Sequence, residues 1–208
     1  VHKEKEGNYK DDKKDGKWTT WYKNGQKKEE YNYKDGIPDG EWTSWFGNGL
    51  QSGEGNFKDG TGTFLQLHEN NQKSYEVIYK DGLGKMTHWH ENGQKKSEGK
   101  FKDGKQDGKW TEWHENGQIH IEGNSKDDKG DGKWTEWHEN GQKKSEGKVK
   151  DDKGDGKWTE WHENGQKKSE GKFKDDKENG KWTEWDENGQ INSVATYKDG
   201  VCISGDCP

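Results

Sequence analysis

Hydrophobic and polar residues recur along the chain with a period of 22–24 residues. One unit reads GKWTEWHENGQKKSEGKVKDDKGD. Apolar and polar positions alternate on both sides of an Asn-Gly pair within it, which predicts a β-hairpin. A half-unit occupies residues 1–15, and full units begin at Gly16, Gly40, Gly62, Gly84, Gly108, Gly132, Gly156 and Gly180.

The unit at Gly132 shows the expected hairpin in detail. Its first strand covers residues 134–139, and Asn140-Gly141 suits the two positive-φ positions of a type I′ turn. The second strand covers residues 142–150, and a polar loop over residues 151–155 leads to the next unit. We expect the shorter spacing after Gly40 and Gly62 to arise in this loop, because an even change there keeps every side chain on its face.

These features predict an all-β fold, an elongated single-layer antiparallel β-meander of about eight tandem 22–24-residue hairpins. The array covers residues 1–200, and a tail with two cysteines covers residues 201–208. No helix is expected to cover either face of the sheet.

Tryptophan falls on both faces of this predicted sheet. With a two-residue turn, Trp134 lies opposite Gly147 and Trp137 lies opposite Lys144. We expect the Trp134 ring to cover Gly147, and Trp110 to cover Gly123, whereas Trp18 faces Tyr31 and has no glycine to cover. The expected aromatic ladder consists of Trp18, Trp21, Trp42, Trp45, Trp89, Trp110, Trp113, Trp134, Trp137, Trp158, Trp161, Trp182 and Trp185.

The pattern G-x-W-x-x-W-x-x-N-G, followed by a charged strand and a K-D-G loop, resembles MORN repeats of the bacterial variant type. Trp158, Trp161, Asn164, Gly165 and Gly171 match that motif. The resemblance covers about residues 1–200 and implies a single-layer β-sheet that serves as a scaffold or a membrane-adjacent platform. The central units depart from the motif at Phe64, Leu67, Asn71 and Met86.

Composition excludes several classes of protein. Only 21% of the 208 residues are hydrophobic and 38% are charged, so a globule with a central core is not expected. Thirteen Trp argue against a disordered chain. A net charge of −6 without any arginine argues against nucleic acid as a partner. No apolar run is long enough to form a transmembrane segment.

Candidate chemistry is sparse. His68, His90, His114, His138 and His162 recur once per unit, but hairpins repeat about every 10 Å, too far apart for two to share a zinc ion. Asp-rich loops over residues 126–132 and 151–156 leave calcium as a minor alternative to ordinary turn chemistry. No arrangement suits a nucleophile or an acid–base pair, so we expect a non-enzymatic protein without a cofactor.

Cys202 and Cys207 are the only cysteines. Four residues separate them, which favours a small disulfide loop and an extracellular or cell-surface location. Reduced thiols or a shared metal, with a cytoplasmic location, are the alternatives.

The sequence therefore predicts a structural or interaction scaffold whose partner is another protein or a second copy of itself. Strand edges at Lys3 and Tyr9 and at Val201 and Ile203 would allow copies to pair head to tail into a filament. The alternative is a surface module in which exposed Trp rings bind carbohydrate, such as surface glycans.

Overall fold

The computed structural model describes residues 4–207, which are all-β and form nineteen strands. Successive strands pair antiparallel in sequence order, and no helix occurs among the described residues. The predicted single-layer β-meander is therefore confirmed. The chain divides after Gly104 into two compact units.

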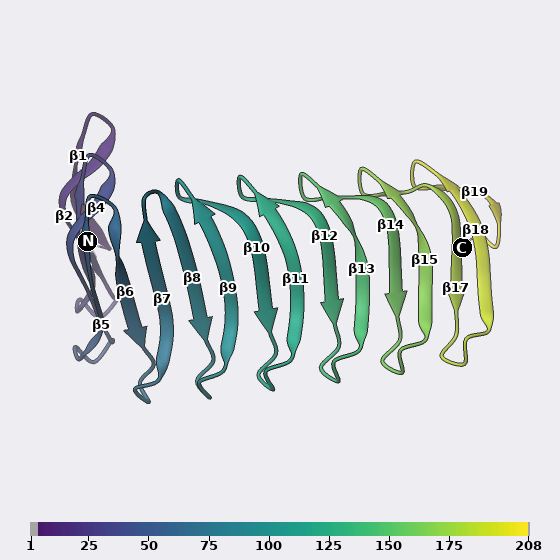
Figure 1. Ribbon diagram of the computed structural model, residues 1–208, viewed down its shortest axis with the longest axis horizontal. Coiled ribbons are helices and arrows are strands. Elements are labelled where there is room, and N and C mark those ends of the chain that lie inside the picture. The colour runs from purple at the N-terminus through teal and green to yellow at the C-terminus, as the bar shows by residue number, and fades with distance from the viewer. Residues whose placement is uncertain (1–3, 208) are drawn as a thin grey trace. The chain divides into compact units, whose positions relative to one another are not determined.

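Unit 1 is a nine-stranded antiparallel meander (Figure 1). Its strands are β1 (Lys5–Lys10), β2 (Lys13–Trp21), β3 (Lys27–Lys34), β4 (Ile37–Trp45), β5 (Gln51–Lys58), β6 (Thr61–Leu67), β7 (Lys73–Lys80), β8 (Leu83–Trp89) and β9 (Lys95–Lys102).

Unit 2 continues the same alternation, and in it β16 and β17 are two parts of one interrupted strand beside β15. Its strands are β10 (Lys105–Trp113), β11 (Ile119–Lys126), β12 (Lys129–Trp137), β13 (Lys143–Lys150), β14 (Lys153–Trp161), β15 (Lys167–Lys174), β16 (Lys177–Glu178), β17 (Gly180–Trp185), β18 (Ile191–Lys198) and β19 (Val201–Gly205).

The Asn-Gly turn differs from the expected type I′ turn. The backbone N–H of His138 donates to the Gln142 carbonyl, and the backbone N–H of Gly141 donates to the His138 carbonyl. Gly141 has a positive φ, whereas Asn140 does not. This is a type I turn followed by a glycine bulge. The extra bulge residue moves the register by one, so Trp137 pairs with Lys143 and the prediction of Lys144 was wrong.

The type I′ turns lie at the other end of the strands. Asp151 and Asp152 both adopt positive φ, at 51° and 67°, and Lys150 pairs with Lys153 across them. The expected polar loop over residues 151–155 is therefore a two-residue turn followed at once by β14. Aspartate tolerates the left-handed conformation because its short side chain bonds to nearby backbone.

The two-residue difference between units lies inside a strand and not in a loop. Strands β12 and β14 have nine residues, and the register with the preceding strand shifts where Gly132 and Gly156 adopt φ near 110°. Strands β6 and β8 have seven residues, and each pairs with its preceding strand, β5 or β7, without a register shift. The longer units thus contain a two-residue bulge that the shorter ones lack, and both keep the same faces.

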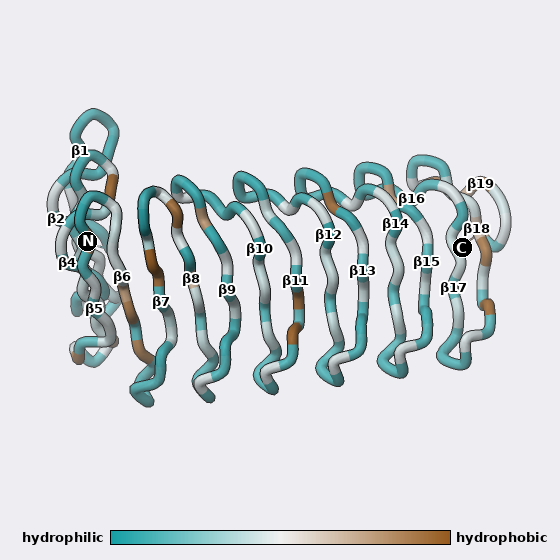
Figure 2. The backbone as a smooth tube through the Cα atoms, in the orientation of Figure 1, coloured by the Kyte–Doolittle hydropathy of each residue, from teal (hydrophilic) through white to brown (hydrophobic). Residues whose placement is uncertain are grey.

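Hydrophobic packing is concentrated in unit 1. Phe57, Phe64 and Val77 form a buried cluster, with Trp42 and Tyr75 packed against it. Figure 2 shows the hydrophobic residues of this unit gathered on β6, β7 and β8, in a backbone that is otherwise largely polar. Within unit 1 the ribbon turns from face-on at β6–β9 to edge-on at β1–β5 (Figure 1), so the sheet is strongly twisted there.

We predict that deleting Asp155 and Gly156 together converts the 24-residue unit into a 22-residue one and preserves the fold. The resulting Lys153-Gly154-Lys157-Trp158 matches Thr61-Gly62-Thr63-Phe64 of the shorter unit. The free energy of unfolding, measured by urea denaturation, should fall by no more than about 1 kcal/mol. Deleting Asp155 alone should cost about 3 kcal/mol or more, because it reverses the faces of the following residues. Equal losses in the two variants would contradict this account.

Candidate functional site

In four hairpins the first Trp lies over a glycine of the preceding strand, at Trp18, Trp134, Trp158 and Trp182. An ideal Cβ on Gly147 would lie 1.8 Å from the Trp158 ring, and one on Gly123 would lie 2.3 Å from the Trp134 ring. The expectations that Trp134 covers Gly147 and that Trp110 covers Gly123 were therefore wrong, although both pairs lie opposite each other in register. Trp18 also has a glycine partner, since its ring covers Gly7 on β1. The indole thus joins neighbouring hairpins rather than the two strands of one hairpin.

The second Trp lies on the opposite face, and in four hairpins a lysine of the preceding hairpin lies over its ring, at Trp45, Trp89, Trp161 and Trp185. The Lys143 ammonium is 5.6 Å from the centre of the Trp161 ring, and the same arrangement joins Lys167 to Trp185. All thirteen Trp are buried or half-buried, and none of them is an exposed residue. The Trp rings are therefore partly covered by neighbouring residues, whereas carbohydrate stacking requires an exposed ring face.

The same face carries a repeated triad of two lysines around one glutamate. Glu170 accepts from Lys167 at 2.6 Å and from Lys157 at 3.1 Å, and Glu146 is bonded to Lys143 and Lys133 in the same way. These lysine hydrogen bonds hold the pKa of both carboxyls below its ordinary value, with the bonds from Lys143 and Lys167 as the largest cause.

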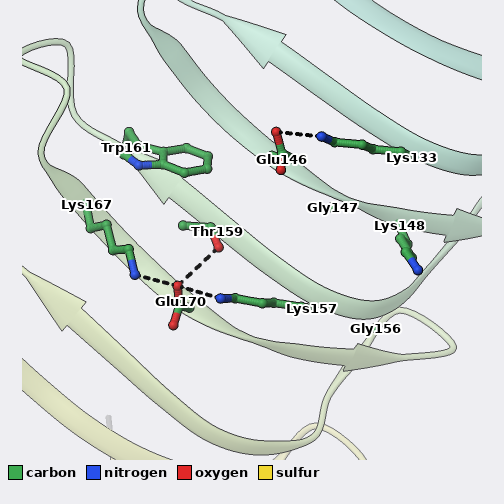
Figure 3. Close-up of a pocket in the computed structure, with 10 residues that line it drawn as sticks. All are labelled: Lys133, Glu146, Gly147, Lys148, Gly156, Lys157, Thr159, Trp161, Lys167 and Glu170. Atoms are coloured by element: carbon green, nitrogen blue, oxygen red, sulfur yellow. Dashed lines mark hydrogen bonds and ion pairs between the residues drawn. The ribbon is translucent and has the colours of Figure 1, made fainter.

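A shallow groove of about 570 Å³ lies between two such triads (Figure 3). Trp161 and Thr159 line it, and its charged residues are four lysines and two glutamates, an excess of positive charge. A related groove lies one hairpin earlier, around Trp137. We call this side of unit 2 the lysine-rich face. The charged residues of the groove in Figure 3 are Lys133, Lys148, Lys157, Lys167, Glu146 and Glu170.

The recurring histidines connect one hairpin to the next. The His138 Nε2 lies 3.1 Å from the carbonyl oxygen of Trp161, and His114, His162 and His68 make the equivalent contact. A carbonyl only accepts, so this ring nitrogen donates. Tyr22 uses its hydroxyl for the same bond.

The turn asparagine acts in parallel with the histidine. The Asn140 amide donates to the Glu163 carbonyl at 2.7 Å, and Asn116 and Asn164 make the equivalent bond. The Asn-Gly turns of neighbouring hairpins are thereby stacked on one another.

The Asp-rich turns use their carboxylates internally. The Asp152 carboxylate accepts from the Gly130 N–H at 2.6 Å, while the Asp152 N–H donates to the Gly130 carbonyl. Asp176 and Gly154 form the same reciprocal pair. Within residues 4–207 no group of three potential metal ligands comes together. The Asp-rich turns therefore give no support to the calcium alternative.

The residues proposed for the disulfide loop and for the strand edges lie on or next to the first and last strands. Cys202 and Cys207 form a disulfide that closes the end of β19. Val201 and Ile203 are exposed on the same strand, and Tyr9 is exposed on β1, where its ring packs edge-on against Trp18. Lys3 lies outside the described residues. Head-to-tail pairing through these edges stays a prediction.

Comparison with known families bears on this repeated geometry. The model of the MORN repeat variant family matches six segments that together cover more than half of the chain. The chain belongs to this MORN repeat family. The matched segments are residues 14–35, 83–103, 106–127, 130–151, 154–175 and 178–199. A comparison with curated proteins finds no match.

MORN repeats are generally non-catalytic and typically mediate protein interactions. Residues 36–82 lie between two matched segments, and they contain the unit at Gly62, which departs from the motif at Phe64, Leu67 and Asn71. Among the described residues no helix is long and apolar enough to cross a membrane.

Several residues of the lysine-rich face were not singled out from the sequence. Lys133, Lys143 and Glu146 look like ordinary surface charges, because their spacing gives no sign that two lysines converge on one carboxylate. The available signal was their repetition in register with the second Trp. The bonds of His138 and Asn140 to the next hairpin were missed for the same reason.

We predict that acidification weakens the fold through these triads. A carboxyl with a lowered folded-state pKa stabilises the fold above the ordinary Glu pKa of about 4.3, and this contribution is lost as the pH falls through the folded-state value. Replacing Glu146→Gln and Glu170→Gln together should therefore lower stability at about pH 7 and leave it little changed at about pH 3. Urea midpoints at both pH values measure the effect. The exposed turn variants Glu139→Gln and Glu163→Gln are the control, and an equal response in that pair would contradict the prediction.

We predict that the bond between Cys202 and Cys207 stabilises β19 locally. Closing so short a loop is worth about 2 kcal/mol in the chain-entropy model, so Cys207→Ser should speed amide exchange in β19 while leaving β12–β14 unchanged. Hydrogen exchange by NMR measures this. Mass spectrometry of freshly isolated protein, without reductant, should show no alkylatable thiol. Finding two such thiols would contradict the bridge.

Proposed function

We propose that this protein is a non-enzymatic scaffold that binds an extended acidic segment of a partner protein along its lysine-rich face. The observation that carries the proposal is the repeated groove beside Trp161, in which lysines outnumber glutamates two to one. The chain as a whole is negative, so this positive surface is a local feature. A positive groove attracts an acidic partner and suppresses binding of basic ones.

The spacing of the grooves favours an extended peptide. Each hairpin adds two strands, or about 10 Å, and an extended chain covers this distance in about three residues. The groove at Trp137 and the groove at Trp161 share Lys133 and Glu146, so they form a continuous path. A peptide with an acidic residue at every third position would therefore meet a new set of lysines with each acidic side chain.

Carbohydrate binding is the less favoured function. Stacking a sugar on Trp161 requires an open ring face, and the Lys143 ammonium lies over that ring. A disulfide between Cys202 and Cys207 supports a location in an oxidising compartment, so we propose that the scaffold acts outside the cell or on its surface.

The binding test compares two acidic peptides of equal composition. One has glutamate at every third position, and the other has the same glutamates in one block. We expect the spaced peptide to bind more tightly in isothermal titration calorimetry and to weaken as salt rises. A neutral oligosaccharide tests the carbohydrate alternative. Binding of the oligosaccharide without binding of either peptide would overturn the proposal.

Matched variants locate the binding face. Lys133→Gln with Lys157→Gln removes two lysines of the lysine-rich face, each paired with a glutamate. Lys144→Gln with Lys168→Gln removes two lysines that pair with Glu136 and Glu160 on the opposite face. We expect the first pair to weaken peptide binding about tenfold and the second to change it by less than about twofold. Equal losses in both pairs would show that binding depends on net charge alone.

A further inference from the structure

Unit 1 contains a cavity that the family repeat does not account for. Its volume is about 510 Å³, within the range of small-molecule sites. Four aromatic residues line it, namely Tyr33, Trp42, Tyr75 and Tyr79. Two aspartates of the turns, Asp59 and Asp103, also line it. Although lysine is the most frequent charged residue of the chain, none of the residues that line this cavity is a lysine.

Substitutions within the repeat build the aromatic walls. In the regular hairpin of β12 and β13, the inward positions of the second strand are Ser145, Gly147 and Val149. The corresponding positions of β7 are Tyr75, Val77 and Tyr79. Larger side chains thus replace small ones, and they pack against Phe64 and Trp42, with ring centres 6.0 Å apart for Phe64 and Tyr75 and 5.0 Å apart for Trp42 and Phe64.

Twist of the sheet brings distant strands of unit 1 to this cavity. Tyr33 on β3 and Tyr79 on β7 both line it, and Tyr79 contributes to raising the pKa of Tyr33. Burial is the first cause of that rise, and burial also raises the pKa of Tyr75 to about 12. All three phenols are therefore neutral at physiological pH.

A second set of substitutions places apolar residues where unit 2 has lysines that approach the turn aspartates. In unit 2, Lys129 follows one type I′ turn and approaches Asp151 of the next at 3.7 Å, and Lys105 approaches Asp127 in the same way at 4.0 Å. In unit 1 the corresponding residues are Ile37 for Asp59 and Leu83 for Asp103. Ile37 lies beside the Asp59-Gly60 turn and is half exposed. The negative charges therefore border an apolar surface.

We propose that this cavity binds an organic cation, an ammonium group that carries alkyl substituents. Aromatic rings attract such a cation through their negative faces, and the two carboxylates add attraction that a neutral ligand would not feel. The chain shows this chemistry in the same unit, where the Lys14 ammonium lies 4.7 Å from the Tyr33 ring centre and 5.1 Å from that of Trp18. Glu29 raises the pKa of both Tyr33 and Tyr75, which indicates a further negative charge near the walls.

The first test uses choline and its neutral isostere, in which a tert-butyl group replaces trimethylammonium. Both fill the same space, so their difference isolates the charge. We expect choline to bind the full chain at least about tenfold more tightly in calorimetry, and to shift the NMR signals of Tyr33, Tyr75 and Tyr79. Equal binding of the two compounds, or binding of neither, would overturn the proposal.

Matched variants test the role of the carboxylates. Asp59→Asn with Asp103→Asn removes both charges, and asparagine tolerates the positive φ of these positions, 49° and 50°. We expect choline affinity to fall about tenfold. Asp127→Asn with Asp151→Asn makes the same change at the same turn positions of unit 2 and should leave affinity unchanged. An equal loss in the control pair would overturn the assignment of the site.

The same group occurs free and as a lipid headgroup. Vesicles of phosphatidylcholine, compared with vesicles of phosphatidylglycerol, distinguish the two sources. Binding of soluble choline alone assigns a free ligand, and binding of phosphatidylcholine vesicles that soluble choline displaces assigns the headgroup. Both results support the site, whereas vesicle binding that choline does not displace would contradict it.

Discussion

The contact of an indole ring with a glycine of the preceding hairpin is the interaction on which this sheet depends. Only 21% of the residues are hydrophobic, so the chain has no layer of aliphatic side chains with which to fill a core. Trp158 instead buries its ring against the backbone at Gly147, where any side chain would collide with it. Removing apolar surface from water at every hairpin boundary stabilises the sheet without a second layer.

The two ends of the strands are connected in different ways, and each way fits its residues. Asn140 and His138 reach forward to the next hairpin, so the Asn-Gly ends are stacked by side-chain hydrogen bonds. Asp152 and Gly130 exchange two hydrogen bonds at the opposite ends. Between these ends, the bulge at Gly132 adds residues without reversing the faces, and its positive φ of 110° favours glycine there.

The repeat made most of the fold predictable, because period, alternation and turn residues all point to one antiparallel meander. The turn types were less predictable: Asn-Gly is typical of type I′ turns, yet Asn140-Gly141 here forms a type I turn with a bulge, and the type I′ turn belongs to Asp151-Asp152. A local dipeptide signal does not report how many residues the flanking strands leave for the turn.

The directions of side chains could also not be predicted from the sequence. Pairing places Trp134 opposite Gly147, but whether its ring turns to that strand or to Gly123 depends on a rotamer that spacing does not determine. The cavity of unit 1 could not be predicted from the sequence either, because it is lined by residues of β3 and β7, which are distant in the chain and are brought together by the twist of the sheet. The departures at Phe64 and Met86 gave a hint that the central units differ, without showing how.

The contacts between hairpins join residues that are never far apart in the chain. Trp158 and Gly147 are separated by eleven residues, and His138 and Trp161 by 23. Low sequence separation favours rapid folding, because each contact closes only a short loop. It also means that folding can begin at any hairpin and spread to its neighbours. Because each hairpin contacts only its neighbours, a gene encoding such a sheet can gain hairpins by duplication or lose them by deletion without changing the contacts of distant hairpins.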